Sequence, residues 1–95
     1  MKQISFEQLQ AKQDQGVQLQ LIDVREEEEH RRFNIGGELI PLGEITRKIE
    51  SIARDRPVVF YCRKGVRSQI AIQRLCLKFS DGDFYNLQGG ISNLG

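Results

Sequence analysis

The sequence predicts an α/β domain with a mainly parallel sheet of about five strands, flanked by helices on both faces. Segments with strand character alternate with helical periodicity along the chain, and no repeat, linker or low-complexity stretch interrupts them. The chain has 95 residues, of which 39% are hydrophobic and 28% charged, so its apolar side chains suffice for one small core. We therefore expect residues 1–95 to form a single domain.

A short strand and a helix are expected at the start of the chain. Ile4 lies in the strand, and Ser5 follows as the helix N-cap with Gln8 three residues later, which is the spacing of a capping box. Gly16 is expected to end this helix because glycine commonly follows the last helical turn.

The second strand is predicted over residues 17–24, where alternating apolar residues give way to an unbroken apolar run. Such a strand is half-buried at its start and fully buried at its end. Asp23 then lies at its carboxyl end, and Arg25 follows two residues later. We expect these two residues to form an ion pair.

Residues 26–32 place four glutamates before a histidine and two arginines, an order that complements the helix dipole. The segment is predicted to be a short solvated helix, with His30 on the surface. Its acidic run could also contact a basic protein partner. The i,i+4 ion pairs expected within it are Glu27 with Arg31 and Glu28 with Arg32.

The second half of the chain continues the alternation. Strands are predicted over 38–40, 58–61 and 84–87, and amphipathic helices over 42–52 and 68–79. Residues 58–61 form an apolar, β-branched run that suits a strand covered on both faces. The side chains expected to face the core are Leu42, Ile45, Ile49 and Ile52 on the first helix, and Ile72, Leu75, Cys76 and Phe79 on the second.

Cys62 follows the predicted central strand directly, at the sheet edge where α/β proteins place their ligand sites. The loop after it contains Gly65 and three cations, Arg63, Lys64 and Arg67, and it opens a helix near Ser68. A helix N-terminus and neighbouring cations lower the pKa of a thiol and so favour the reactive thiolate. Cys62 is therefore the candidate nucleophile.

Activation of this thiol is expected to be electrostatic. His30 is the only histidine and belongs to the helix predicted over 26–32, so the sequence offers no adjacent general base. Gly65 allows the loop amides to turn toward one point. The plainer interpretation of Cys62 is a buried strand-end cysteine. For Cys76 the helical register favours core packing over a role as a resolving thiol.

Four motifs together resemble a single-domain rhodanese, a sulfurtransferase, in the right order over nearly the whole chain. The motifs are Leu21-Ile22-Asp23-Val24-Arg25-Glu26, Gly36-Gly37 with Ile40-Pro41, Cys62-Arg63-Lys64-Gly65-Val66-Arg67-Ser68, and Gly89-Gly90-Ile91. The resemblance implies that Cys62 accepts a sulfane sulfur as a persulfide and passes it to a nucleophilic acceptor. It implies that Asp23 and Arg25 order the active loop, whose residues are Arg63, Lys64, Gly65, Val66, Arg67 and Ser68. Within that loop, Arg67 would help to hold the loop and the anionic sulfur, while Arg63 and Lys64 would meet the donor or acceptor.

The spacing of the cysteine loop separates this activity from its chemical rivals. Tyrosine-type and dual-specificity phosphatases resemble the loop but use Cys-x5-Arg, whereas Cys62 and Arg67 give Cys-x4-Arg. The shorter loop suits a single sulfur atom better than a phosphate. A phosphatase or arsenate reductase is therefore less favoured. The alternative within the family is a non-catalytic interaction or sulfur-relay adaptor domain.

The expected partners are a small anionic sulfur donor such as thiosulfate, or a protein persulfide, together with a sulfur-acceptor protein. A net charge of +1 and a pI near 7.8 give no reason to expect nucleic acid or a membrane as partner. No apolar stretch approaches the roughly 20 residues that span a bilayer, and no signal peptide is recognisable. A cytoplasmic location is expected, with no metal and no organic cofactor.

Overall fold

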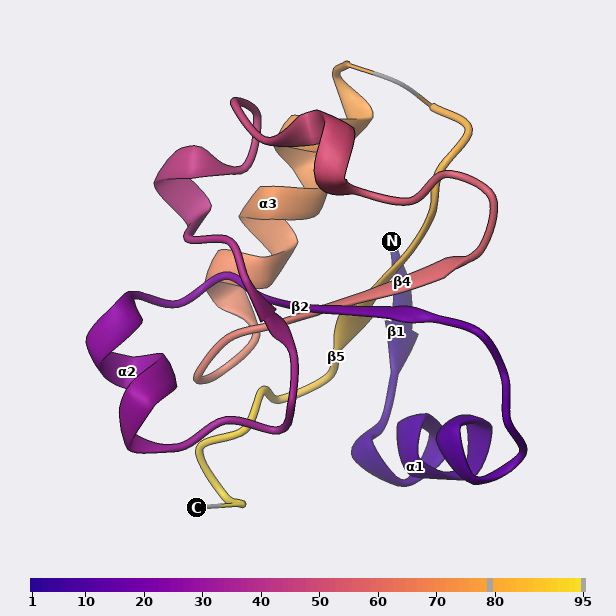
Figure 1. Ribbon diagram of the computed structural model, residues 1–95, viewed down its shortest axis with the longest axis vertical. Coiled ribbons are helices and arrows are strands. Elements are labelled where there is room, and N and C mark those ends of the chain that lie inside the picture. Colours follow the sequence, from indigo (N-terminus) through magenta and orange to yellow (C-terminus); the bar gives the residue numbers. More distant parts are fainter. Residues whose placement is uncertain (79, 95) are drawn as a thin grey trace.

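The structure is a computed structural model and describes residues 1–78 and 80–94. The described residues form a five-stranded sheet in the order β1-β5-β4-β2-β3, and every neighbouring pair of strands is parallel. The predicted α/β class with a parallel sheet is therefore confirmed (Figure 1). The strands are β1 (Lys2–Ile4), β2 (Gln20–Asp23), β3 (Glu38–Leu39), β4 (Pro57–Tyr61) and β5 (Asp83–Leu87).

Strand β4 lies at the centre of the sheet, between β2 and β5. Its four residues from Val58 to Tyr61 are all 0% exposed, as the continuous apolar run predicted. Because side chains alternate along a strand, Val58 and Phe60 enter one apolar cluster while Val59 and Tyr61 enter another. The strand that precedes Cys62 is thus fixed by packing on both faces.

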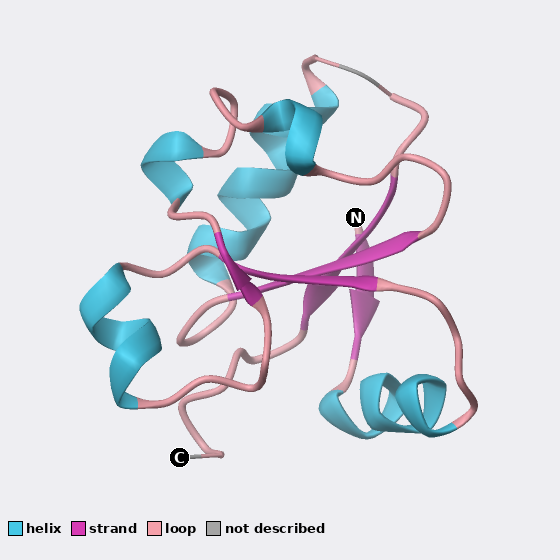
Figure 2. Ribbon diagram, viewed as in Figure 1, coloured by secondary structure: helices cyan, strands magenta, loops and turns pink. Residues whose placement is uncertain are grey.

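Helical segments cover both faces of the sheet (Figure 2). One face packs against α3 (Val66–Cys76) and the 3₁₀ turns η1 (Leu42–Glu44) and η2 (Ile49–Ser51). The other face packs against α1 (Phe6–Asp14) and the segment at Ile91. The short helix α2 (Glu27–Arg32) has no buried residue and lies beside the carboxyl ends of β2 and β4 (Figure 1).

The local signals for the first two helices are confirmed. Ser5 Oγ accepts a hydrogen bond of 3.0 Å from the Gln8 amide, and Gln8 Oε1 accepts one of 2.9 Å from the Ser5 amide, which completes the capping box. The ion pairs predicted within α2 are also present, and both are exposed. These pairs are Arg31 with Glu27, and Arg32 with Glu28 at 2.7 Å.

The helix predicted over 42–52 is wrong in its form. The chain there makes two separate 3₁₀ turns, and Lys48 leaves helical geometry between them with φ −104° and ψ 28°. Gly43 and a succession of β-branched residues have low helix propensity, which favours short turns over a continuous helix. The turns still bury Ile45 and Ile52 and pack the partly buried Leu42 and Ile49 against the same core, so the core-facing positions predicted from the pattern are confirmed.

Helix α3 begins at Val66, two residues before the predicted start at Ser68. Gly65 is its N-cap and has a φ of +94°, a left-handed conformation that glycine adopts without a steric penalty. The predicted core position Phe79 lies outside the described residues. Within the described chain, no helix is both long enough and apolar enough to cross a membrane.

Candidate functional site

Cys62 is the first residue after β4, so the central strand delivers its sulfur to the carboxyl edge of the sheet. The residues that follow the Gly89-Gly90 turn hydrogen bond to the backbone of the cysteine loop. The Ile91 amide donates to the Cys62 carbonyl at 3.1 Å, and the Ser92 amide donates to the Arg63 carbonyl at 2.9 Å. A Cβ atom on Gly90 would lie 2.3 Å from the Arg63 oxygen, so this close approach requires glycine.

Hydrogen bonds converge on the Cys62 sulfur. The amides of Gly65 and Ser68 donate to Sγ at 3.1 and 3.4 Å, and Ser68 Oγ also lies 3.4 Å from it. These amides are free to do so because they belong to the first turn of α3, where amides have no partner within the helix. Cys62 and Ser68 are both almost fully buried.

The pKa of the Cys62 thiol is lowered as a result. Burial alone raises this pKa, because it disfavours the charged form. Hydrogen bonds from Ser68 and from the amides of Gly65 and Lys64 outweigh the burial and bring the pKa below its ordinary value. Through these hydrogen bonds the site favours the thiolate more than an ordinary cysteine does.

Arg67 has a different hydrogen-bond partner from the one expected. Its guanidinium makes two hydrogen bonds with Glu29 on α2, at 2.7 and 2.8 Å, and none of its bonds in the described structure goes to the sulfur. The Arg67 pair lowers the pKa of Glu29 to about 2. Arg67 thus places a positive charge near Cys62, and its two hydrogen bonds to Glu29 hold α2 against the loop.

The predicted pair of Asp23 and Arg25 is confirmed and is almost fully buried. Arg25 Nε and Nη2 donate to the two Asp23 carboxylate oxygens at 3.0 and 2.8 Å, and Nη2 also donates to the Phe33 carbonyl at 2.6 Å. Burial alone would raise the pKa of Asp23, but hydrogen bonds from Arg25 and His30 lower it. This pair fixes the chain between β2 and the end of α2.

His30 was predicted on the surface, and this prediction is wrong. Its Nδ1 lies 2.9 Å from the Asp23 Oδ2 atom, and the side chain is only 23% exposed. The reason is that α2 turns this side chain toward the buried carboxylate, whose oxygens can accept more hydrogen bonds than Arg25 supplies.

Comparison with known proteins decides the family. Residues 5–94 match the rhodanese-like domain. The chain belongs to the rhodanese family. In structure, the rhodanese-like domain protein from Staphylococcus aureus superposes with a TM-score of 0.88 and 29% identity, covering 100% of this chain and 92% of that one.

Two Bacillus subtilis proteins are related in sequence to this rhodanese-like chain. YqhL is 42% identical over 77 residues, which are 80% of this chain and 60% of YqhL. YtwF, named provisionally as a sulfurtransferase, is 35% identical over 94 residues, which are 96% of this chain and 87% of YtwF. The chain thus spans less than two thirds of YqhL but most of YtwF.

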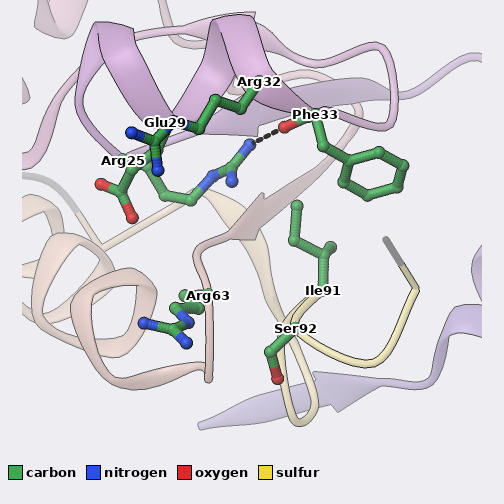
Figure 3. Close-up of a pocket in the computed structure, with 7 residues that line it drawn as sticks. All are labelled: Arg25, Glu29, Arg32, Phe33, Arg63, Ile91 and Ser92. Atoms are coloured by element: carbon green, nitrogen blue, oxygen red, sulfur yellow. Dashed lines mark hydrogen bonds between the residues drawn. The ribbon is translucent and has the colours of Figure 1, made fainter.

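Two pockets adjoin the cysteine loop of this rhodanese-like domain. The first is lined by the loop itself, namely Cys62, Arg63, Lys64, Val66 and Arg67. The second, of about 330 Å³, contains Arg25, Glu29, Arg32, Phe33, Arg63, Ile91 and Ser92 (Figure 3). Arg63 lines both pockets. Arg63 and Lys64 are exposed and make no side-chain hydrogen bond or ion pair within the described residues.

Cys76 was predicted to pack in the core of this rhodanese-like domain, and this prediction is wrong. The residue is exposed, whereas its neighbours Ile72 and Leu75 are buried. Each helical residue is rotated about 100° from the one before it, so Cys76 lies beyond the edge of the face that Leu75 buries. Both cysteines are free thiols.

Sequence reasoning missed two groups at the rhodanese site. Glu29 was assigned to a solvated helix face, although it binds Arg67. Asn86 is 1% exposed and contacts Ser68 behind the sulfur, and Gln3 contacts Asn86 in turn. A polar residue within the apolar run of β5 was the signal that could have revealed Asn86, because buried amides require partners.

Proposed function

We propose that this rhodanese-like domain is a sulfurtransferase that carries sulfane sulfur on Cys62. The observation that carries the proposal is the set of hydrogen bonds on Sγ, from the amides of Gly65 and Ser68 at 3.1 and 3.4 Å. They favour a thiolate at a buried strand end, and the thiolate is the nucleophilic form of cysteine. The relation to YtwF, which is named provisionally as a sulfurtransferase, supports the same activity.

With thiosulfate as donor, the reaction has two displacement steps. The Cys62 thiolate attacks the outer sulfur of thiosulfate, a bond between the two sulfurs forms, and sulfite leaves with the electron pair of the broken bond. An acceptor thiolate or cyanide then attacks the outer sulfur of the persulfide. The Cys62 thiolate leaves and is ready for another cycle. The reaction requires neither a metal nor an organic cofactor.

The loop residues have separate proposed roles in these steps. The amides of Gly65 and Ser68 stabilise negative charge on the sulfur, as preorganised donors do in other enzymes. Arg63 and Lys64, exposed beside the sulfur, attract an anionic donor. Asp23 and Arg25 act at a distance, by fixing the chain that carries Phe33.

The length of the loop supports sulfur over phosphate as the transferred group. Four residues separate Cys62 from Arg67, and the Arg67 guanidinium is occupied by Glu29. An arginine held in this way is not free to clamp the oxygens of a phosphate group. A phosphatase activity is therefore not proposed.

A sulfur-relay function is the second candidate. In this role Cys62 receives sulfur from a protein persulfide and passes it to a sulfur-acceptor protein, and thiosulfate is a poor donor. The exposed cations Arg63 and Lys64 favour acidic protein surfaces at this site. The proposed location for either role is the cytoplasm, where free thiols such as Cys62 and Cys76 stay reduced.

Steady-state turnover tests the proposal. The protein is incubated with thiosulfate and cyanide, and thiocyanate is followed for the wild type, Cys62→Ser and Cys76→Ser. Sulfurtransferase activity predicts turnover in the wild type and in Cys76→Ser, and none in Cys62→Ser. Turnover that is lost in Cys76→Ser but kept in Cys62→Ser would overturn the assignment. Absence of turnover with all three proteins would favour the relay function.

A further inference from the structure

A line of hydrogen-bonded polar side chains runs from the Cys62 sulfur to the surface at β1. It starts at Ser68 on α3, continues to Asn86 on β5 and ends at Gln3 on β1, the residue paired with Asn86 in the sheet register. Ser68 is 0% and Asn86 1% exposed, while Gln3 reaches the surface. Neither Asn86 nor Gln3 has a role in the displacement steps proposed above.

The direction of each hydrogen bond follows from the groups involved. Asn86 Nδ2 donates to Gln3 Oε1 at 2.9 Å, which turns the Asn86 carbonyl oxygen toward Ser68. That oxygen can only accept, so the Ser68 hydroxyl hydrogen points to Asn86. A hydroxyl has one hydrogen. It therefore presents a lone pair to the Cys62 sulfur, 3.4 Å away.

This arrangement treats the two forms of the thiol differently. A neutral Cys62 thiol can donate its hydrogen to Ser68 Oγ, and the hydroxyl of Ser68 and the amide of Asn86 then both keep their hydrogen-bond partners. A thiolate has no hydrogen to donate, so the hydroxyl must rotate to donate to the sulfur. The rotation leaves the Asn86 oxygen without its partner at a buried position, which is unfavourable.

We infer that Asn86 is a positioning residue: it holds the Ser68 hydroxyl and so weakens the stabilisation that this hydroxyl can give to negative charge on Sγ of Cys62. The inference rests on the proposed function for its consequence in sulfur transfer. In the persulfide, Sγ is bonded to the outer sulfur and the charge lies on that outer atom. The hydroxyl can then stay on Asn86.

The consequence for sulfur transfer is that formation of the Cys62 persulfide is favoured. A thiolate that is less stabilised is a stronger nucleophile toward the donor and a poorer leaving group when the acceptor attacks. Asn86 thereby favours the persulfide over the free thiolate. The amides of Gly65 and Ser68 act in the opposite sense, since they stabilise charge on Sγ.

Substitution of Asn86 leaves the charges around the sulfur unchanged. The groups near Cys62 that carry charge are Arg63 and Lys64 on the loop and Arg67 on α3, and Arg67 is paired with Glu29. None of them hydrogen bonds with Asn86 in the described structure. A change in thiol ionisation on substitution therefore reports on the hydroxyl.

The test is the pH profile of Cys62 alkylation by iodoacetamide, measured in a Cys76→Ser background so that one thiol reacts. Asn86→Leu keeps the branch of the side chain at Cγ but has no hydrogen-bonding group, so it frees the Ser68 hydroxyl to donate to the sulfur. It is expected to move the midpoint of the profile to lower pH, so that the thiolate fraction below the midpoint rises about fivefold. Gln3→Met, at an exposed position, is expected to move it in the same direction by less.

Ser68→Ala provides the control that separates positioning from general loosening. In this background the hydroxyl is absent, so Asn86→Leu is expected to leave the midpoint unchanged. An equal shift in both backgrounds, no shift, or a shift to higher pH would overturn the inference. If Asn86→Leu does not fold, Gln3→Met with and without Ser68→Ala decides by the same criteria. Alkylation requires no sulfur transfer, so this result is independent of whether the proposed activity is found.

Discussion

Arg67 and Glu29 form a two-pronged ion pair that joins the cysteine loop to α2, with Nη1 to Oε1 at 2.7 Å and Nη2 to Oε2 at 2.8 Å. Glu29 also accepts a hydrogen bond of 3.1 Å from the Glu26 amide in the capping box of α2. The Glu29 carboxylate thus accepts a hydrogen bond at the start of α2 and also binds Arg67, which lies in the first turn of α3. The pair therefore holds α2 close to the loop that carries Cys62.

The ion pair predicts a specific dependence of stability on pH. The pKa of Glu29 in the folded protein is about 2, below its ordinary value of 4.5, so its stabilising effect is present above pH 4.5 and is lost as the pH falls toward 2. Glu29→Gln removes the effect. The unfolding free energies of the wild type and Glu29→Gln are expected to differ by no more than about 1 kcal/mol at pH 7, because both partners are about one third exposed.

Urea unfolding at a series of pH values checks this prediction. The difference between the two proteins is expected to shrink from pH 5 to pH 2. Glu28→Gln is the matched control, since its pair with Arg32 is 78% exposed on both sides, and we expect little change from it. A difference that grows as the pH falls would contradict the role assigned to the Glu29 carboxylate.

Removal of one partner from the buried pair of Asp23 and Arg25 is expected to be far more costly. Asp23→Asn leaves the Arg25 charge without its counter-ion at a position that is 5% exposed. Such a change destabilises proteins by about 3 kcal/mol or more. The midpoint of urea unfolding measures it, and a loss as small as that of Glu28→Gln would argue that the pair contributes little to the fold.

The two glycines of the turn behind the loop offer a matched pair of substitutions. Both have positive φ, +77° for Gly89 and +66° for Gly90, so alanine costs about 1–2 kcal/mol of backbone strain at either. Only at Gly90 would the new Cβ meet the Arg63 carbonyl oxygen, at 2.3 Å, whereas at Gly89 it meets nothing within 4 Å.

Gly90→Ala is therefore expected to displace the loop and to slow Cys62 alkylation by about tenfold, because small displacements of positioned groups reduce reactivity strongly. Gly89→Ala is expected to lose stability with little effect on alkylation. The rate with iodoacetamide at pH 7, measured alongside unfolding, separates the two effects. Equal rates in the two variants would refute the proposed support of the loop by Gly90.

Arg63 and Lys64 are expected to select anionic reagents. Iodoacetate and iodoacetamide have similar size but differ in charge, so the ratio of their rates with Cys62 measures local electrostatic attraction. The double variant Arg63→Gln, Lys64→Gln is expected to lower this ratio about fivefold. Lys78→Gln removes a charge beyond the far end of α3 and is expected to leave it unchanged. An equal effect on both reagents would count against a role in anion binding.

The sequence predicted those parts of the site that depend on local patterns. The apolar run before Cys62 identified β4, and the rule that ligand sites follow the carboxyl ends of parallel strands placed Asp23 and Cys62 at one edge. Gly65 and the cations after it indicated the cradle for the sulfur. Each of these features is recognised from neighbouring residues in one short stretch of the chain, and the rule for parallel strands then brings the two stretches together.

Contacts between distant segments were not predictable in this way. Glu29 and Arg67 are 38 residues apart, and Asn86 and Gln3 are 83 apart, so no periodicity links them. Cys76 illustrates a second limit. A helical pattern identifies the buried stripe but not its exact edge, and one residue past Leu75 the side chain is exposed.

Intact mass is the most direct test of the claim that Cys62 carries the sulfur. The wild type, Cys62→Ser and Cys76→Ser are each treated with thiosulfate, desalted and weighed by mass spectrometry. The wild type and Cys76→Ser are expected to gain one sulfur atom that a reductant removes, and Cys62→Ser none. A removable sulfur on Cys62→Ser that is missing from Cys76→Ser would contradict the account.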